Sequence, residues 1–208
     1  RRKLCSIAVA LFLGVFYTIG FTLAEGEPDI FYLPTPQYVV NEMLEIAGTN
    51  KDDVVYDLGC GDGRFVITAA KKFGARGVGI DIDPERIRES QANARSAGVV
   101  DRVKFIEADL FKTNVSQATV VALYLLSQLN LRPRPQLFKE LKPGTRIVSH
   151  NFDMDDWRPD VSEKLGNSLY YLWILPADVA GLWNVKLSLP KGPDMNYRVE
   201  VTQRFQEL

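Results

Sequence analysis

Cysteine and histidine are scarce in this chain, which excludes two classes of protein. Its 208 residues include two cysteines and one histidine. Cys5 lies in an apolar run and Cys60 in a glycine-rich turn, so no disulfide framework and no metal site is expected, and His150 alone adds no ligand cluster. An excess of one charge is also missing, with 25 basic against 26 acidic residues. We therefore expect no nucleic-acid partner.

Charge is absent altogether from residues 4–24. This stretch of 21 residues follows "RRK" and precedes "EGEPD". A membrane-spanning helix needs about 20 apolar residues and the hydrophobic region of a signal peptide about 7 to 15, so the length favours an uncleaved anchor. A cleaved signal peptide ending at Thr22-Leu23-Ala24 and a buried core helix are the alternatives. The flanking charges favour a folded domain on the non-cytoplasmic side of a membrane.

From residue 37 the pattern alternates between helix and strand. Apolar residues at helical spacing, ended by glycine, predict helices over 37–48, 64–74, 84–98 and 136–144. Short apolar runs between them predict strands over 53–59, 77–81, 103–109, 118–126 and 145–150. This alternation predicts an α/β fold with a doubly wound, mostly parallel sheet.

After His150 the pattern changes to antiparallel hairpins. Residues 160–176 predict two strands at the sheet's edge, joined near 165–168. Residues 179–189 and 197–206 predict a second hairpin, which is marginal alone and needs a packing partner. The chain then divides into a hydrophobic anchor or signal segment (1–24), a linker and lid (25–36), a catalytic domain (37–176) and a hairpin extension (177–208).

A turn with three glycines marks the expected ligand site. In "VVYDLGCGDGRF" (54–65), glycines 59, 61 and 63 follow a short strand. Arg64 stands where the dinucleotide fingerprint has its third glycine, and a Walker Gly-Lys-Ser/Thr ending is missing. Asp57 and Asp62 flank the turn. These carboxylates would repel a pyrophosphate and favour a positively charged ligand.

Two more carboxylates follow the next strands of the expected sheet. Asp81 ends the second strand, 22 residues after Gly59, where it can accept the hydroxyls of a ribose. Asp109 follows the third strand in "EADL", where a side chain and a backbone N–H can bind an adenine edge. Because parallel strands bring their carboxyl ends to one edge, these residues are expected to share a site.

The motifs D-x-G-x-G-x-G (57–63), "GIDIDPERI" (79–87) and "EADLF" (107–111) resemble those of the seven-strand S-adenosylmethionine-dependent methyltransferases. The resemblance covers about residues 34–176 and implies a Rossmann-like sheet, methyl transfer and S-adenosyl-L-methionine as cofactor. "YLPTPQYVVNEML" and Trp157 are similar to one subgroup, the membrane-anchored mitochondrial protein-lysine methyltransferases of the adenine nucleotide translocase and ATP synthase c subunit, with their bacterial relatives. Asp81 in place of a glutamate, "LYLLSQLN" and the last hairpin depart from that subgroup.

The resemblance also implies roles for individual residues. The methionine part of the cofactor would be held by Asp57, Gly59, Gly61 and Gly63, the ribose by Asp81, and the adenine by Asp109 with Leu110. Pro34, Thr35 and Pro36 would form a lid, and Cys60, Ile82 and Ala108 complete the expected cofactor-binding set.

Three residues are candidates for catalysis: Tyr124, His150 and Asp153. The cofactor's sulfonium already activates its methyl group, so the protein chiefly aligns the reactants. A lysine acceptor has a pKa of about 10.4 in solution and must lose its proton in a dry pocket or to one of these side chains. His150 has no accompanying G-x-S-x-G nucleophile turn.

The resemblance implies a protein-lysine methyltransferase with a protein acceptor, including a membrane-embedded one. Two alternatives remain: a methyltransferase for a small molecule or lipid, and a non-catalytic nucleoside-binding scaffold. We expect a membrane-anchored or exported protein, in a bacterial envelope or a mitochondrial membrane. Export conflicts with the cytosolic or organellar supply of the cofactor.

Overall fold

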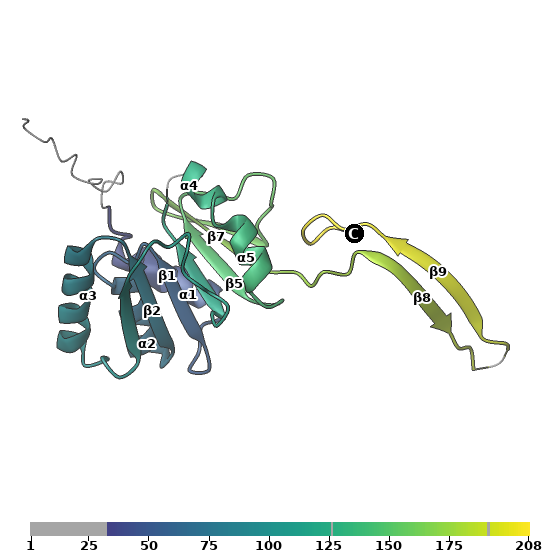
Figure 1. Cartoon of the computed structure of the whole chain (residues 1–208), viewed down its shortest axis with the longest axis horizontal. Coiled ribbons are helices and arrows are strands. Elements are labelled where there is room, and N and C mark those ends of the chain that lie inside the picture. Colours follow the sequence, from purple (N-terminus) through teal and green to yellow (C-terminus); the bar gives the residue numbers. More distant parts are fainter. Residues whose placement is uncertain (1–32, 126, 191) are drawn as a thin grey trace, which may run out of the picture. The chain divides into compact units, whose positions relative to one another are not determined.

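The computed structural model describes residues 33–125, 127–190 and 192–208, and its central element is a seven-stranded mixed sheet. The strand order is β3-β2-β1-β4-β5-β7-β6 (Figure 1). The parallel strands are β1 (Val54–Leu58), β2 (Arg76–Asp81), β3 (Val103–Glu107), β4 (Val120–Leu123) and β5 (Arg146–His150). β6 (Val161–Leu165) and β7 (Ser168–Ile174) are antiparallel. The predicted doubly wound, Rossmann-like sheet with its edge hairpin is confirmed.

Helices cover both faces of this sheet. They are α1 (Gln37–Ile46), α2 (Arg64–Phe73), α3 (Pro84–Ala97), α4 (Ser127–Leu131) and α5 (Arg134–Glu140). Alternate side chains of β1 reach opposite cores: Val55 packs with α1 and α2, whereas Tyr56 and Leu58 pack with Leu137 of α5. The α3 helix begins at Pro84, where the Asp83 carboxylate accepts a hydrogen bond from the backbone N–H of Glu85.

The structure moves the boundaries of several predicted elements. The strand predicted over 103–109 ends at Glu107, and the one predicted over 197–206 spans Met195–Val201. β4 ends at Leu123 rather than 126, and a short helix absent from the prediction, α4, begins at Ser127. α5 begins at Arg134, two residues before its predicted start, because prolines suit the first turn of a helix. It ends at Glu140 because Leu141 takes an extended conformation, with φ −80° and ψ 152°.

A separate two-stranded sheet, β8 (Gly181–Leu187) with β9 (Met195–Val201), forms the predicted second hairpin. The residues after it contact the main domain, because Phe205 packs on Trp157 and the Trp157 indole N–H donates to Gln206 Oε1 at 2.8 Å. The predicted N-terminal hydrophobic helix lies outside the described residues. Within the described ranges, no helix has the length and apolar character needed to cross a membrane.

Candidate functional site

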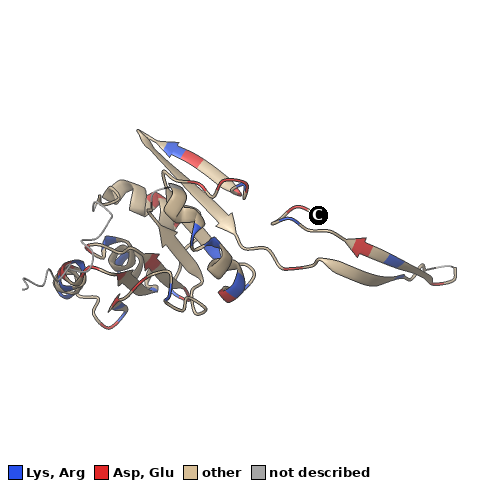
Figure 2. Ribbon diagram, turned by 45° about the horizontal axis from the view of Figure 1, so that its top comes forward, with Lys and Arg blue, Asp and Glu red and all other residues tan. Residues whose placement is uncertain are grey.

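The carboxyl ends of the parallel strands bring most of the predicted site residues to one edge of the sheet. Asp57 lies near the end of β1, and Asp81 ends β2. Tyr124 directly follows β4, and His150 ends β5. In doubly wound folds this edge binds the ligand. Figure 2 shows acidic and basic residues interspersed around this domain.

The glycine turn is held against the end of β2. Gly59, Gly61 and Gly63 all have positive φ, of 93°, 51° and 79°. The backbone N–H groups of Gly59 and Cys60 both donate to the carbonyl of Ile80, at 2.8 and 2.9 Å. The Cys60 side chain is buried, and a Cβ on Gly79 would come within 2.8 Å of its sulfur. Cys60 therefore offers the turn its backbone rather than its thiol.

Gly63 has a packing reason for lacking a side chain. A Cβ at this position would lie 2.7 Å from Cε1 of Phe105 and 2.8 Å from Cβ of Ser90. A Cβ on Gly59 would meet only Leu125 Cδ2, at 3.4 Å. Gly63 thus lets the start of α2 approach β3 and α3, which is the role that the third glycine has in dinucleotide-binding folds. The sequence pattern had suggested a ligand contact at all three glycines.

Asp81 is oriented by two backbone donors. Its Oδ2 accepts from Gly61 N–H at 2.8 Å and its Oδ1 from Asp83 N–H at 3.0 Å. A carboxylate has about four acceptor positions, so two oxygens already fixed in space can still accept both ribose hydroxyls. The neighbouring Ile82 is 63 % exposed, so an apolar surface lies beside this carboxylate.

Asp57 is buried next to other carboxylates. Burial raises the pKa of Asp57 well above its usual range, and the nearby charges of Asp81 and Asp62 raise it further. A cationic ligand would relieve this repulsion, and S-adenosylmethionine carries both a sulfonium and an ammonium group. These carboxylates, with the oriented oxygens of Asp81, fit that cofactor.

Asp109, the residue expected to hold the adenine, lies two residues after the end of β3. Its Oδ1 accepts from the backbone N–H of Phe111 at 2.9 Å, and Lys112 forms an ion pair with it at 3.1 Å. These interactions, the Phe111 hydrogen bond foremost, lower the pKa of Asp109. Ala108 donates its N–H to the carbonyl of Asp81, so the loop continues the pairing of β3 with β2. Leu110 is partly buried against the core below.

The expected lid residues are tied to both halves of the site. The guanidinium of Arg64 pairs with Asp62 at 2.5 Å and donates to the carbonyl of Thr35 at 2.9 Å. Thr35 Oγ1 lies 3.2 Å from Nδ1 of His150. Pro36 precedes α1, and its carbonyl accepts the first backbone hydrogen bonds of that helix. Arg64 was missed as a site residue, although a basic residue directly after an Asp-Gly pair was the available signal.

Aromatic rings gather at the ends of β4 and β5. The His150 ring lies 4.1 Å from that of Tyr124, and Phe152 stacks on Tyr124 at 6.0 Å between ring centroids. His150 is 2 % exposed, its Nε2 has no hydrogen-bond partner, and burial lowers its pKa to about 4. The ring is therefore neutral at physiological pH.

Hydrogen bonds from a buried asparagine hold the backbone next to these aromatic residues. Asn130, which sequence reasoning missed, donates from Nδ2 to Ser149 Oγ and to the carbonyl of Phe152, each at 2.9 Å. Asp153, the third catalytic candidate, is exposed and accepts a hydrogen bond from Asp155 N–H. The structure thus brings Tyr124 and His150 together and places the Asp153 carboxylate in solvent.

The chain is similar to known methyltransferases over the part that carries this site. Residues 57–161 match the family model of the ANTKMT methyltransferase domain. A "Protein-lysine N-methyltransferase" of Saccharolobus islandicus is 47% identical over 153 residues, which are 71% of this chain and 95% of that protein. The human lysine N-methyltransferase of the ATP synthase c subunit is 31% identical over 62% of this chain, which spans 54% of the human protein. A crystal structure of an "RNA methyltransferase from Salinibacter ruber", in complex with S-adenosyl-L-homocysteine, has 51% identity and a TM-score of 0.70, covering 71% of this chain and 96% of that one.

Proposed function

Since the chain belongs to the ANTKMT methyltransferase domain family and is an S-adenosylmethionine-dependent methyltransferase, we propose that it methylates the side-chain amine of lysine in a protein. The observation that carries the proposal is the 47% identity to a protein named for lysine methylation, over 95% of that protein. Methyl transfer to RNA is the second candidate, because the similar Salinibacter ruber enzyme is named for it. The near balance of 25 basic and 26 acidic residues argues against it.

The residues at the strand ends divide the work of holding the cofactor. Asp57 and the glycine turn would hold its methionine part, Asp81 the ribose, and Ile82, Asp109 and Leu110 the adenine. The bound cofactor supplies a methyl group activated by its sulfonium. Positioning of the acceptor amine then contributes most of what the protein adds, up to about 7–11 kcal/mol of the barrier.

Tyr124, His150 and Phe152 would receive the lysine. Their aromatic faces exclude water from the amine, which lowers its pKa toward the neutral form. In the tautomer in which His150 donates from Nδ1 to Thr35 Oγ1, the unpartnered Nε2 is an acceptor for the ammonium proton. The low pKa of His150 makes this nitrogen a weak base, so it holds and orients the proton on its way to solvent.

The acceptor class is tested with a labelled methyl group. The full chain is incubated with S-adenosylmethionine and extract of the source organism, and Asp81→Ala serves as the control deficient in cofactor binding. We expect the label in methyl-lysine after acid hydrolysis of the protein fraction. Label in nucleosides after nuclease digestion would favour RNA as the acceptor, and label in the solvent-extracted fraction would favour a lipid or small molecule.

The proposal has a second part, which concerns location. Residues 4–24 carry no charge and are long enough to span a bilayer, so the enzyme would be anchored in a membrane. Its acceptors would then include proteins at or in that membrane. Flotation of the full chain with lipid vesicles after alkaline washing tests this part independently of activity.

A further inference from the structure

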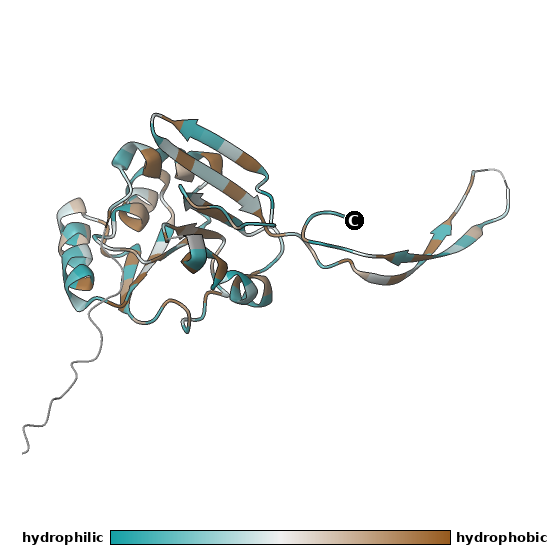
Figure 3. Cartoon of the chain, turned by 90° about the horizontal axis from the view of Figure 1, so that it is seen from above, coloured by the Kyte–Doolittle hydropathy of each residue, from teal (hydrophilic) through white to brown (hydrophobic). Residues whose placement is uncertain are grey.

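The ribbon formed by β8 and β9 has one face made only of apolar side chains. In the register of the two strands, Trp183 lies opposite Val199, Val185 opposite Tyr197, and Leu187 opposite Met195. Paired residues project to the same side of a sheet, so these side chains form one continuous face. We call this set the apolar face: Trp183, Val185, Leu187, Met195, Tyr197 and Val199. Figure 3 shows hydrophobic and hydrophilic residues alternating along both strands.

The other face of the ribbon is mostly polar. It pairs Leu182 with Glu200, Asn184 with Arg198, and Lys186 with Asn196. A sheet with one apolar face and one polar face typically packs its apolar face on an apolar surface and exposes its polar face to water. The residues of the main cores lie on other elements of the described chain, and none of them belongs to β8 or β9.

Nothing among the described residues covers the apolar face. Trp183, Val185, Leu187, Tyr197 and Val199 are between 41 and 49 % exposed. A contiguous exposed patch of large apolar side chains marks an interaction surface, and a lone two-stranded ribbon is marginal in water. We therefore expect the apolar face to bind another apolar surface.

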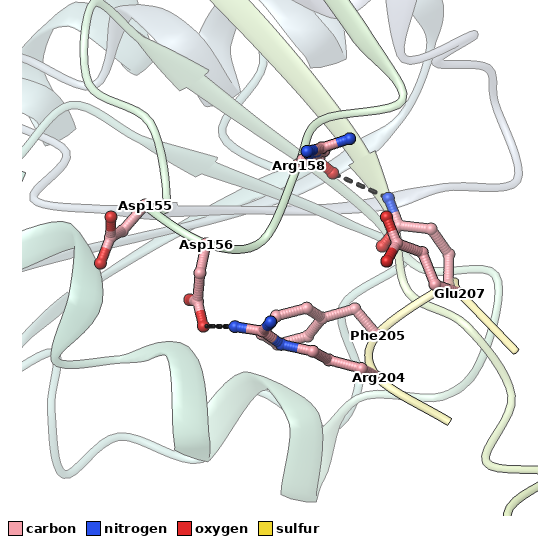
Figure 4. A pocket seen from close by; sticks show the side chains of 7 residues that line it. Asp155, Asp156, Arg158, Arg204, Phe205 and Glu207 are labelled. Carbon is pink, nitrogen blue, oxygen red and sulfur yellow. Dashed lines mark hydrogen bonds and ion pairs between the residues drawn. The ribbon is translucent and has the colours of Figure 1, made fainter. Parts of the chain in front are cut away.

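The base of the ribbon is tied to the domain. Within the extension, the Gln203 side chain joins the two ends of the ribbon, because it accepts from the backbone N–H of Val179 at 2.7 Å and donates to the carbonyl of Ala177 at 2.9 Å. Beyond it, Arg204 pairs with Asp156 at 2.6 Å (Figure 4). The ribbon is thus an attached part of the enzyme rather than a loose tail.

The apolar face is too small to form a stable dimer with the ribbon of a second copy. Seven residues per strand make a face about 23 Å long and, for two strands, about 10 Å wide. Even if the corrugated side chains double this footprint, it stays well under the roughly 800 Å² per partner of a standard stable interface.

A lipid surface suits the same face better. Tryptophan and tyrosine beside aliphatic side chains are typical of the membrane interface, where Lys186 and Arg198 on the back could remain in water. Only eight residues, 25–32, separate the uncharged segment from the first described residue, so a chain anchored by 4–24 keeps Leu33 within about 30 Å of the bilayer. Tethering of this kind makes even weak insertion effective.

We propose that the apolar face of the β8–β9 ribbon docks on the bilayer that residues 4–24 enter, an inference that rests on the proposed anchor. The ribbon is then a second membrane contact, which fixes the distance and tilt of the active site relative to the membrane.

Tryptophan fluorescence tests the docking directly. Trp157 and Trp173 are fully buried, whereas Trp183 is 48 % exposed, so the difference between wild type and Trp183→Phe isolates one reporter. The full chain is reconstituted into phosphatidylcholine vesicles with and without brominated acyl chains. We expect the brominated lipid to quench most of the Trp183 component. Val185→Gln/Val199→Gln should abolish that quenching, whereas Leu182→Gln, on the polar face of the same strand, should retain it.

The other outcomes distinguish failure of the docking from failure of the proposed anchor or of the proposed lysine methylation. Titration with S-adenosylmethionine confirms that each variant is folded, because the ribbon lies outside the cofactor site. A chain that floats with the vesicles while Trp183 stays unquenched keeps the anchor and overturns the docking. The docking would also be overturned if Trp183 is unquenched and the protein is a dimer in detergent that Val185→Gln/Val199→Gln converts into monomers. That result would show that a second copy covers the apolar face. A chain that does not float overturns anchor and docking together and leaves lysine methylation untouched.

Discussion

Thr35 Oγ1 and His150 Nδ1 lie 3.2 Å apart although 115 residues separate them in the sequence. The carbonyl of Thr35 also accepts from Arg64, which pairs with Asp62 in the glycine turn. Thr35, two residues before α1, therefore contacts both His150 and the arginine that pairs with the glycine turn. Removal of the Thr35 hydroxyl should alter the orientation of His150 and leave the carbonyl contact to Arg64 in place.

Thr35→Val removes the contact to His150 with little change in volume. A neutral hydrogen bond contributes about 1 kcal/mol, so we expect kcat/KM to fall about fivefold. The loss should appear mainly in kcat for the acceptor, because His150 loses its fixed orientation. Ser96→Ala is the control, since its hydroxyl donates to the carbonyl of Ala92 within α3. Equal losses in the two variants would contradict the assigned role of Thr35.

His150 is the only histidine of the 208 residues, so its ring can be titrated by NMR without assignment. We expect a pKa near the value of about 4 that burial produces, against 6.5 for an exposed ring. A depressed histidine pKa means that the unfolded chain binds the proton more tightly. The contribution of His150 to the free energy of unfolding should therefore fall as pH drops from about 6.5 to about 4, by at most about 1.4 kcal/mol per pH unit.

His150→Gln should flatten that part of the stability curve. Chemical unfolding of wild type and variant at matched pH values measures the difference between their free energies of unfolding. This subtraction is needed because the raised pKa of Asp57 makes its own contribution to stability change with pH in the opposite direction over part of the same range. A ring that titrates near 6.5 would show that His150 is solvated, and would remove it from the proposed acceptor pocket.

Asp57→Asn should separate stability from cofactor binding. The raised pKa of Asp57 means that its contribution to stability is present at low pH and is lost as pH rises through that pKa. The neutral amide avoids this loss, so we expect a higher Tm of the cofactor-free variant at pH 7. Binding of S-adenosylmethionine should weaken by about 10- to 100-fold, the value of a hydrogen bond to a charged group.

The proton on Asp57 gives this prediction a second readout. Binding of a cation favours the ionised carboxyl, so wild type should release a proton on binding and bind more tightly as pH rises toward the raised pKa. Calorimetry in buffers of different ionisation enthalpy measures the proton. The exposed Asp52→Asn should behave as wild type, and proton release that persists in Asp57→Asn would assign it to another group.

Gly63→Ala should destabilise the domain more than Gly98→Ala. Both glycines have positive φ, of 79° and 70°, but only at Gly63 would a Cβ meet other atoms within 4 Å. We expect about 1–2 kcal/mol for the left-handed backbone alone, and about 1–3 kcal/mol more for overpacking at Gly63. Phe105→Leu should recover part of the extra loss, because the Phe105 ring is the nearest obstacle. Equal unfolding free energies would place the role of Gly63 in ligand contact instead.

The sequence predicted those features of the fold that local chemistry determines. Asp83 and Pro84 begin α3 and Gly98 ends it, because capping, proline φ and left-handed glycine act within a few residues. The apolar runs placed every strand of the parallel sheet, and the motifs placed Asp57, Asp81 and Asp109 at one edge of it.

Contacts between distant segments were beyond the sequence pattern. The approach of Tyr124 to His150 depends on β4 and β5 being neighbours in the sheet. The bond from Arg64 to Thr35 depends on how the segment before α1 crosses the glycine turn. α4 was missed because five residues carry too little periodicity to separate a helix from the end of a strand.

The packing of Phe205 and Gln206 on Trp157 has a consequence for synthesis of the chain. Trp157 follows β5 by seven residues and belongs to the core beneath the sheet. Domains fold progressively as they leave the ribosome, yet this indole gains two of its partners only after residues 205 and 206 have emerged. A chain that lacks residues 205 and 206 therefore exposes an aromatic surface to chaperones and proteases, and these two residues are what covers it.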